Sequence, residues 1–396
     1  MPPSVTLSGS TNALKRWYEG DHCKPGPCRS PYSLLSGANS QARFLDPANN
    51  DSRGAGPRID ELRQGGHHLQ RMAQPGCCIV IAEPFDATAV ERLRAAGEVV
   101  VLDACDEAHL KEAVADCDAL LVRTRAAVTR AVIESARRLR VIGRGGVGLE
   151  NIDLDAARER GIAVVHTPHA STDAVADLTV GMMIALLRNV RGCDAMVRKG
   201  QFWKAREGSI SREICELTLG IVGMGRIGQA VARRCRNGFG MTVIYNDIIS
   251  PGWLDFVATP VTKDQLYAQA DVVTLHVLLT EITQNLIDAV ALKKFKKGAF
   301  LINTSRGGVV DSLALANALA VGIPAGAALD VFDPEPLPSD HPLMQAPSTL
   351  FTPHIGARSV AALARMNDVV DDVVRVLQDR LPLYPAWLDK DGLIPP

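Results

Sequence analysis

The stretch ELTLGIVGMGRIGQAVARRCRNGFGMTVIYND, residues 216–247, carries the clearest signal of the fold class. Its apolar run at 217–222 predicts a strand that leads into G-x-G-x-x-G, formed by Gly223, Gly225 and Gly228, and then into a helix. The first glycine permits a tight turn, the second lets a pyrophosphate approach the backbone, and the third allows close packing of helix and strand. The stretch therefore predicts a dinucleotide-binding unit.

Three further residues of the same stretch indicate which dinucleotide binds. Arg226 and Ile227 begin the predicted helix, where exposed N–H groups and the positive end of the helix dipole can hold phosphates. Asp247 ends a second predicted strand at 242–245. An acid at this place accepts hydrogen bonds from the adenosine ribose and repels a 2′-phosphate. We therefore expect NAD, in preference to NADP.

On both sides of this stretch, predicted strands and helices alternate, which is typical of parallel βαβ units. A helix predicted over 175–199 separates two such series. We expect an α/β fold of two Rossmann-like or flavodoxin-like lobes with parallel sheets, with cofactor and substrate in the cleft between them. The predicted domains are an N-terminal extension at 1–75, a substrate-binding lobe at 76–174 completed by 356–396, and an NAD-binding lobe at 175–355.

Composition narrows the classes of function. The 396 residues carry a net charge of −1, so a basic field for nucleic acid or an anionic membrane is absent. No apolar run approaches the ~20 residues that a membrane span needs. The nine cysteines lack the spacing of a zinc site or a disulfide framework, which favours a reducing cytoplasmic compartment and predicts no metal.

Residues 1–75 differ from the rest of the chain. They are rich in Gly, Pro, Ser and Asn and lack a helical or strand period, which predicts a disordered extension. From Met72 the text becomes MAQPGCCIVIAEPF, a short lead-in to a strand. Met72 is therefore the predicted natural start, or 1–75 is a dispensable tail.

Four residues suited to chemistry follow successive predicted strands of the second series. They are Arg306, Asp330, Glu335 and His354. Taken singly, each can be a surface charge or a residue that ends a strand. Together they lie where open α/β sheets bind ligands, beyond the carboxyl ends of the strands. His276 is interpreted as a strand-end residue whose backbone lines the cofactor.

This set suits hydride transfer to a keto carbon. Negative charge then develops on the oxygen, so the site needs an acid and a nearby cation. Histidine titrates near neutrality, and a carboxylate on its far nitrogen orients the ring. His354 with a neighbouring carboxylate meets the first need. Arg306 can hold a substrate carboxylate and polarise the keto oxygen.

The chain from about residue 78 to 390 resembles the D-isomer-specific 2-hydroxyacid dehydrogenases. The shared motifs are GIVGMGRIGQAVA, DVVTLHVLLT, FLINTSRGGVVD, GAALDVFDPEP, TPHIGA and, in the first lobe, VIGRGGVGLENIDLDAARERGIAVVHTP. The resemblance implies that Arg306 binds the carboxylate and carbonyl of the substrate. It also implies that His354 is the acid/base and Glu335 its partner.

The resemblance implies further contacts. Asp330 would hold the nicotinamide carboxamide, and the rest of the cofactor would be lined by His276, Val277, Thr304, Ser305 and Gly356. Backbone N–H groups of the GGVG turn would take the substrate carboxylate, at Gly146, Val147 and Gly148. A C-terminal helix would pack its apolar stripe on the first lobe, through Val360, Leu363, Met366, Val370, Val373 and Leu377. Members of the family are commonly homodimers joined through their cofactor lobes.

The sequence departs from the family pattern at three places. Leu278 stands where proline is frequent, and His166 where asparagine is frequent. The interval from Gly228 to Asp247 is longer than usual by one residue, which we place at 237–238.

The choice of 2-hydroxy acid stays open at this point. In LLVRTRAAVT, residues 120–129, Arg123 and Arg125 are spaced i, i+2, so an extended segment would point both at one phosphate. Two solvated arginines are the alternative. This stretch resembles 3-phosphoglycerate dehydrogenases, whereas TDAVADLT at 172–179 resembles glyoxylate and hydroxypyruvate reductases. We favour 3-phosphoglycerate, with glyoxylate/hydroxypyruvate reduction as the second candidate.

The end of the chain differs from that of some related proteins. The chain stops soon after His354, so we expect no serine-sensing regulatory domain of the kind found in longer phosphoglycerate dehydrogenases. The transcriptional C-terminal binding proteins, which sense NAD(H) and bind other proteins, share the fold and the Arg-Glu-His set. They usually carry a tryptophan soon after the histidine, whereas GARSVAALA follows here.

Overall fold

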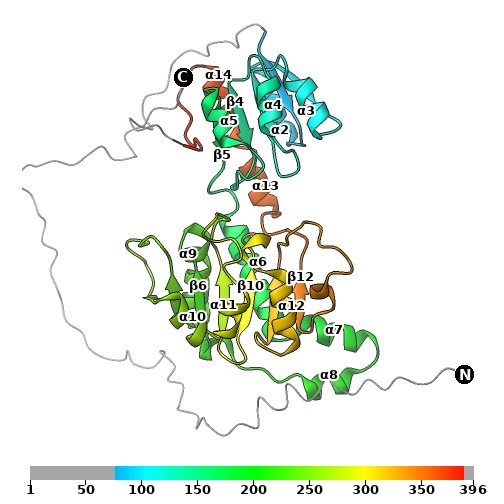
Figure 1. The fold of residues 1–396 in the computed structure, drawn as a ribbon, viewed down its shortest axis with the longest axis vertical. Coiled ribbons are helices and arrows are strands. Elements are labelled where there is room, and N and C mark those ends of the chain that lie inside the picture. The colour runs from blue at the N-terminus through cyan, green and yellow to red at the C-terminus, as the bar shows by residue number, and fades with distance from the viewer. Residues whose placement is uncertain (1–75, 388–396) are drawn as a thin grey trace, which may run out of the picture. The chain divides into compact units, whose positions relative to one another are not determined.

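The computed structural model describes residues 76–387. The predictions of an extension at 1–75 and of a start at Met72 lie outside the described residues, as does the last part of the predicted substrate lobe, 388–396. Figure 1 shows the described elements as two separate parallel sheets, each with helices against it. The α/β prediction with two parallel sheets is confirmed.

The first sheet has five parallel strands in the order β2-β1-β3-β4-β5, which is the flavodoxin-like order. The strands are β1 (Cys78–Ile81), β2 (Glu98–Val101), β3 (Ala119–Val122), β4 (Val141–Arg144) and β5 (Ala163–His166). The connecting helices are α2 (Ala87–Arg94), α3 (Glu107–Val114), α4 (Arg130–Ser135) and α5 (Leu154–Glu159). Each helix begins after an Asp or Thr whose side chain accepts backbone N–H bonds, which explains why such short segments form helices at these places.

Two C-terminal helices return to this sheet, α13 (Val360–Met366) and α14 (Val369–Leu377). Helix α14 packs against β4, β5 and α2. The predicted apolar stripe is confirmed for Met366, Val370, Val373 and Leu377, which are buried. It is wrong for Val360, which is 89% exposed, because the segment forms two helices and their apolar faces do not continue one stripe.

The second sheet has seven parallel strands in the order β12-β11-β10-β9-β6-β7-β8. They are β6 (Thr218–Val222), β7 (Thr242–Asn246), β8 (Thr259–Pro260), β9 (Val272–Leu275), β10 (Phe300–Asn303), β11 (Gly326–Leu329) and β12 (Thr349–Phe351). The order reverses between β6 and β9, which is the switch point where Rossmann sheets bind ligands. Strand β8 escaped prediction because it has only two residues and one of them is proline.

Helices cover both faces of this second sheet. They are α6 (Thr172–Leu187), α9 (Arg226–Arg233), α10 (Lys263–Gln269), α11 (Ala289–Lys293) and α12 (Ser312–Ala320), with short 3-10 turns at Ile214–Glu216, Gly307–Val309 and Pro342–Gln345. Helix α6 packs against α9 and the strands β10, β11 and β12. Because both faces of the sheet are covered, its central strands β6, β9, β10 and β11 are buried along most of their length.

The single helix predicted over 175–199 is wrong. The structure has α6 and then α7 (Val190–Arg198), followed by α8 (Phe202–Gly208). The break is at Asn189, whose φ of 46° is left-handed. Asparagine tolerates that conformation better than most residues, so the apolar pattern around Asn189 did not reveal the break.

Helix α9 runs directly into a π-helical turn, Arg234–Gly238. A π-turn holds one more residue than an α-turn, so it can absorb a single-residue insertion without disturbing either end of a helix. This is the segment where the sequence placed the extra residue between Gly228 and Asp247. The insertion therefore leaves the start of α9 in place.

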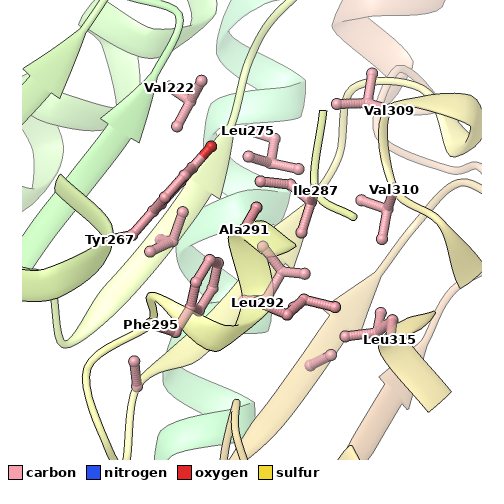
Figure 2. Packing of buried hydrophobic residues seen from close by; sticks show 14 of the residues in the cluster. Val222, Tyr267, Leu275, Ile287, Ala291, Leu292, Phe295, Val309, Val310 and Leu315 are labelled. Atoms are coloured by element: carbon pink, nitrogen blue, oxygen red, sulfur yellow. The ribbon is translucent and has the colours of Figure 1, made fainter. Parts of the chain in front are cut away.

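Figure 2 shows the apolar layer between the second sheet and the helices α10, α11 and α12. Tyr267 and Phe295 stack there with ring centroids 5.2 Å apart, next to Leu275 of β9. The opposite face carries a separate layer that includes Leu219 and Ile221 of β6. The strand ends are thus held between two packed layers, which gives the loops after them a rigid base.

Three further features of residues 76–387 bear on function. None of their helices is long and apolar enough to cross a membrane. Within the same range, no group of three or more His, Cys, Asp or Glu side chains is placed to hold a metal ion. The seven cysteines of the described part of the chain form no disulfide with one another.

Candidate active site

The glycine-rich loop begins directly after β6. Gly223 has a φ of +94°, and a Cβ built on it would lie 2.6 Å from the carbonyl oxygen of His276. A Cβ on Gly228 would lie 2.1 Å from the carbonyl oxygen of Gly223, whereas a Cβ on Gly225 would meet nothing within 4 Å. The three glycines thus have the geometry that the sequence predicts: a tight turn, open space for a ligand, and close packing of helix on strand.

The donors and acceptors around this loop fit a dinucleotide. Helix α9 starts at Arg226 and Ile227 without a side-chain cap from the residues that the structure describes, so its first N–H groups face the open space at Gly225. Asp247 follows β7, and its Oδ2 accepts the N–H of Met224 at 2.6 Å. The carboxylate expected at the ribose therefore also fixes the shape of the loop.

His276 lies across the switch point from Gly223. Its N–H donates to the carbonyl of Val222 at 2.8 Å, and its Nε2 shares a 3.0 Å hydrogen bond with Thr274 Oγ1. Burial lowers the pKa of its ring to about 3, so the ring is neutral near pH 7. This placement agrees with a residue whose backbone, with that of Val277, lines the cofactor, and it leaves the ring no acid role.

Asn303, at the end of β10, organises the loop that carries Arg306. Its Oδ1 accepts the N–H of Ser305 at 3.0 Å and the hydroxyl of Ser305 at 2.7 Å, and its Nδ2 donates to the carbonyl of Arg306 at 2.9 Å. Thr304 shares a 2.8 Å hydrogen bond with Thr179 of α6. Asn303 was not among the predicted site residues, although it is buried at the end of the strand that leads to Arg306.

His354 and Glu335 form a pair next to this loop. Glu335 Oε2 lies 2.8 Å from His354 Nδ1, and Oε1 accepts the N–H of Phe332 at 3.0 Å. The two loops touch, because a Cβ on Gly307 would lie only 1.9 Å from the backbone of Phe332. The Glu335 contact uses Nδ1 and leaves Nε2 of His354 for a substrate.

Two physical features mark this pair as more than a surface contact. His354 has a φ of 52°, a conformation that costs a non-glycine residue energy and is typical of functional sites. Burial raises the pKa of Glu335, but hydrogen bonds from His354 and Phe332 and the charge of Arg306 outweigh burial and lower the pKa overall. Glu335 therefore stays anionic and can stabilise an imidazolium.

Asp330 shapes the turn on which His354 lies. Its carboxylate is 1% exposed and accepts the N–H groups of Ile355 at 2.9 Å and Gly356 at 2.8 Å. A Cβ on Gly356 would lie 3.0 Å from the same carboxylate. The structure thus assigns both residues a part in the turn, and their contact with the nicotinamide stays a prediction.

The GGVG turn of the first lobe comes next to Arg306 through Glu150, which was not among the predicted site residues. Its Oε1 accepts the N–H of Arg306 Nε at 2.7 Å. Arg144 was also missed: it is buried directly before the turn, and burial lowers its pKa to about 10. His166 Nδ1 lies 2.9 Å from the carbonyl of Val147, so the histidine that replaces the usual asparagine holds the turn.

Arg123 and Arg125 do not lie on an extended segment, so the geometric premise for a shared phosphate is wrong. The chain bends here because Glu83, which is buried, accepts the N–H groups of residues 123, 124, 125 and 126. Arg123 lies 4.5 Å from the ring centre of Phe85 and donates to the carbonyl of Pro84. Arg125 is 73% exposed and lies 3.5 Å from Glu83. Arg123 is half-buried, so Arg125 is the more accessible of the two to an anion from solvent.

The chain is similar in sequence and in structure to known proteins. Residues 180–356 match the family model of the D-isomer specific 2-hydroxyacid dehydrogenase NAD binding domain. A glyoxylate reductase of Thermofilum pendens is 37% identical over 335 residues, which cover 81% of this chain and 96% of that protein. The TT0316 protein of Thermus thermophilus is similar in structure, with a TM-score of 0.73 and 38% identity over 78% of this chain and 100% of that one.

A D-3-phosphoglycerate dehydrogenase of Methanocaldococcus jannaschii is 39% identical over 307 residues, which cover 76% of this chain and 58% of that protein. The chain thus spans little more than half the length of this curated relative.

Proposed function

We propose, because the chain belongs to the D-isomer-specific 2-hydroxyacid dehydrogenase family, that it is an NAD-dependent oxidoreductase that interconverts a D-2-hydroxy acid and its 2-keto acid. The observation that carries the proposal is the pair of His354 Nδ1 and Glu335 Oε2, 2.8 Å apart. The loop of Arg306 packs directly against the loop of this pair. An acid, its orienting carboxylate and a guanidinium are the groups that reduction of a keto acid requires.

Residues 180–356 form an NAD-binding domain of this family. The loop 223–228, the start of α9 and Asp247 would hold the pyrophosphate and ribose, because they combine open space, free N–H groups and a carboxylate at the switch point. Thr304, Ser305 and Asp330 would line the rest of the cofactor. When bound, NADH supplies the hydride for reduction and NAD accepts it in oxidation.

The residues of the chain perform the other steps. Arg306 binds the substrate carboxylate and polarises the keto oxygen, together with N–H groups of the turn 146–148. In the direction of reduction, His354 donates its Nε2 proton to that oxygen, and in oxidation it accepts the proton back. Glu335 holds Nδ1 and stabilises the charged ring. Such acid-base help is typically worth ~10²–10⁴ in rate.

For the substrate we propose 3-phosphoglycerate, with glyoxylate or hydroxypyruvate as the second candidate. The exposed guanidinium of Arg125 in the first lobe favours an extra anionic group such as a phosphate. The second candidate is favoured by similarity to the glyoxylate reductase of Thermofilum pendens, which is 37% identical to this chain. Phosphohydroxypyruvate and hydroxypyruvate differ by one phosphate, so a direct comparison separates the two candidates.

The test is NADH oxidation by the purified full chain with 3-phosphohydroxypyruvate, hydroxypyruvate and glyoxylate. We expect turnover with at least one keto acid and the highest kcat/KM with 3-phosphohydroxypyruvate. A higher kcat/KM with glyoxylate or hydroxypyruvate would support the second candidate. If no 2-keto acid is reduced while NADH still binds, the enzymatic proposal fails and a protein that senses NAD(H) and binds partners takes its place.

The proposal extends to assembly and compartment. Large apolar side chains are exposed along α7, α8 and the following loop, at Val190, Val197, Phe202, Trp203 and Ile210. A surface of this kind is covered when two cofactor lobes join, so we expect a homodimer, and light scattering should give twice the chain mass of 42.4 kDa.

The lack of disulfides among the described cysteines suits a reducing cytoplasmic compartment.

A further inference from the structure

Glu150 holds the arginine that we assign to the substrate. Its Oε1 accepts the N–H of Arg306 Nε at 2.7 Å, across 156 positions of sequence. The side chains are 43% exposed for Glu150 and 28% exposed for Arg306. The contact therefore lies at the edge of the site, within reach of solvent.

The same carboxylate lies against the turn that is expected to take the substrate. A Cβ built on Gly148 would lie 2.1 Å from Arg306 Nη2 and 2.2 Å from Glu150 Oε2. The carboxylate of Glu150 and the guanidinium of Arg306 thus lie side by side against the backbone of the turn at Gly148. The guanidinium and the backbone of this turn are the two groups that would bind the carboxylate of a 2-keto acid.

The donors of Arg306 limit how a second carboxylate can bind. Its Nη1 donates to the carbonyl of Ser305 at 2.7 Å, and its Nε donates to Glu150. A carboxylate prefers to contact two neighbouring nitrogens of a guanidinium. With Nη1 held by Ser305, the remaining pair is Nε and Nη2, and Glu150 occupies Nε.

We infer, on the basis of the proposed function, that Glu150 occupies the position of the substrate carboxylate on Arg306 and leaves it when a 2-keto acid binds. Glu150 is then a residue that sets substrate affinity. Burial would raise its pKa, but the hydrogen bond and charge of Arg306 lower it, so Glu150 is anionic at neutral pH and competes as a charged group. Its exposure keeps the competition modest, because half-exposed ion pairs are weak.

The experiment measures binding of oxamate, an unreactive analogue of a 2-keto acid, to the full chain saturated with NADH. The dissociation constant is obtained from the change in NADH fluorescence for the wild type and for Glu150→Gln. Glu159→Gln is the matched control, because Glu159 also pairs with an arginine, Arg130, at 2.6 Å on the exposed surface of the first lobe. We expect Glu150→Gln to lower Kd about fivefold and Glu159→Gln to leave it unchanged.

The other outcomes separate this inference from the proposed function. An unchanged or raised Kd in Glu150→Gln, with oxamate still bound by the wild type, overturns the inference alone, because Glu150 would then only position Arg306. Absence of oxamate binding in all three proteins overturns the proposed function and this inference with it. If Glu150→Gln fails to fold, judged by its Tm, Glu150→Asp replaces it: the side chain is one methylene shorter, so Kd should again fall, and an unchanged or higher Kd overturns the inference.

Discussion

The two sides of the candidate site are held in different ways. On the side of the second sheet, Asn303 fixes the loop of Arg306 within three positions of itself, and Asp330 fixes the turn of His354 with N–H bonds. On the side of the first sheet, the loop that contains Arg123 and Arg125 depends on Glu83, which lies 40 positions before Arg123. The proposed chemistry thus rests on loops at the ends of neighbouring strands of one sheet, held by contacts that span from 2 to 26 positions of sequence. In the proposed function, recognition of the rest of the substrate would depend on the loop that Glu83 holds across 40 positions of sequence.

The largest effect on activity is expected on the side of the second sheet. His354→Ala removes the group that protonates the keto oxygen, so kcat should fall by ~10²–10⁴ while NADH binding is retained. Rates of NADH oxidation and NADH fluorescence titrations measure the two quantities. His109→Ala is the matched control, because His109 also pairs with a carboxylate, Asp106, but on the exposed face of α3. A loss of less than tenfold in His354→Ala would remove His354 from the acid/base role.

Glu335→Gln tests whether His354 needs a negatively charged partner at Nδ1. A neutral amide can still contact Nδ1 but stabilises the imidazolium less, so we expect kcat to fall by roughly 10 to 10². The expected loss is smaller than in His354→Ala because Nε2 still carries a proton. Steady-state rates of both variants under the same conditions give the comparison. Equal activity of Glu335→Gln and the wild type would show that the pair is structural only.

Glu83→Gln tests, by its effect on stability, whether Glu83 holds the loop of the first sheet that contains Arg123. The Glu83 carboxylate accepts hydrogen bonds from four backbone N–H groups. Replacing this charged acceptor by a neutral amide should lower the free energy of unfolding by about 2 kcal/mol. Urea unfolding at neutral pH measures the difference, with Glu91→Gln, on the surface of α2 and paired with Arg94, as the control. A difference no larger than that of the control would mean that the loop is held by other contacts.

The same residue gives a pH dependence of stability. Burial raises the pKa of Glu83, but the four backbone hydrogen bonds outweigh it and lower the pKa. A lowered pKa stabilises the folded state above the unfolded pKa of about 4.3, and this contribution is lost as pH falls through the folded pKa. The stability gap between the wild type and Glu83→Gln should therefore be constant from about pH 5.5 to 7 and narrow below about pH 4. A gap that widens on acidification would contradict this assignment.

The smallest effect is expected for Arg125, the exposed arginine on the side of the first sheet. Arg125→Ala should raise KM for 3-phosphohydroxypyruvate by about tenfold and leave KM for hydroxypyruvate within about twofold, because only the first carries a phosphate. Arg137→Ala is a suitable control, since Arg137 is an exposed arginine of the same lobe. Equal changes for both keto acids would exclude Arg125 from phosphate recognition.

The sequence predicted the parts of the fold that depend on local patterns. The strand before Gly223, the three glycine positions and the residues after β10, β11 and β12 follow from alternation and turn chemistry within short windows. The break at Asn189 was missed because a left-handed asparagine leaves no mark in an apolar pattern. The bend at Arg123 was missed because its cause, Glu83, is distant in sequence, and Glu150 was missed because its contact with Arg306 forms only in the folded chain.

A crystal structure of the full chain with NADH and oxamate would test whether Arg306, Glu335 and His354 form one site for a 2-keto acid. We predict that the oxamate carboxylate contacts Arg306 Nε and Nη2 and that Glu150 has moved off Arg306. The amide oxygen of oxamate, which stands in for the keto oxygen of a substrate, should lie within hydrogen-bond distance of His354 Nε2. Oxamate bound away from His354, or absent while NADH occupies the loop 223–228, would contradict the proposed catalytic site.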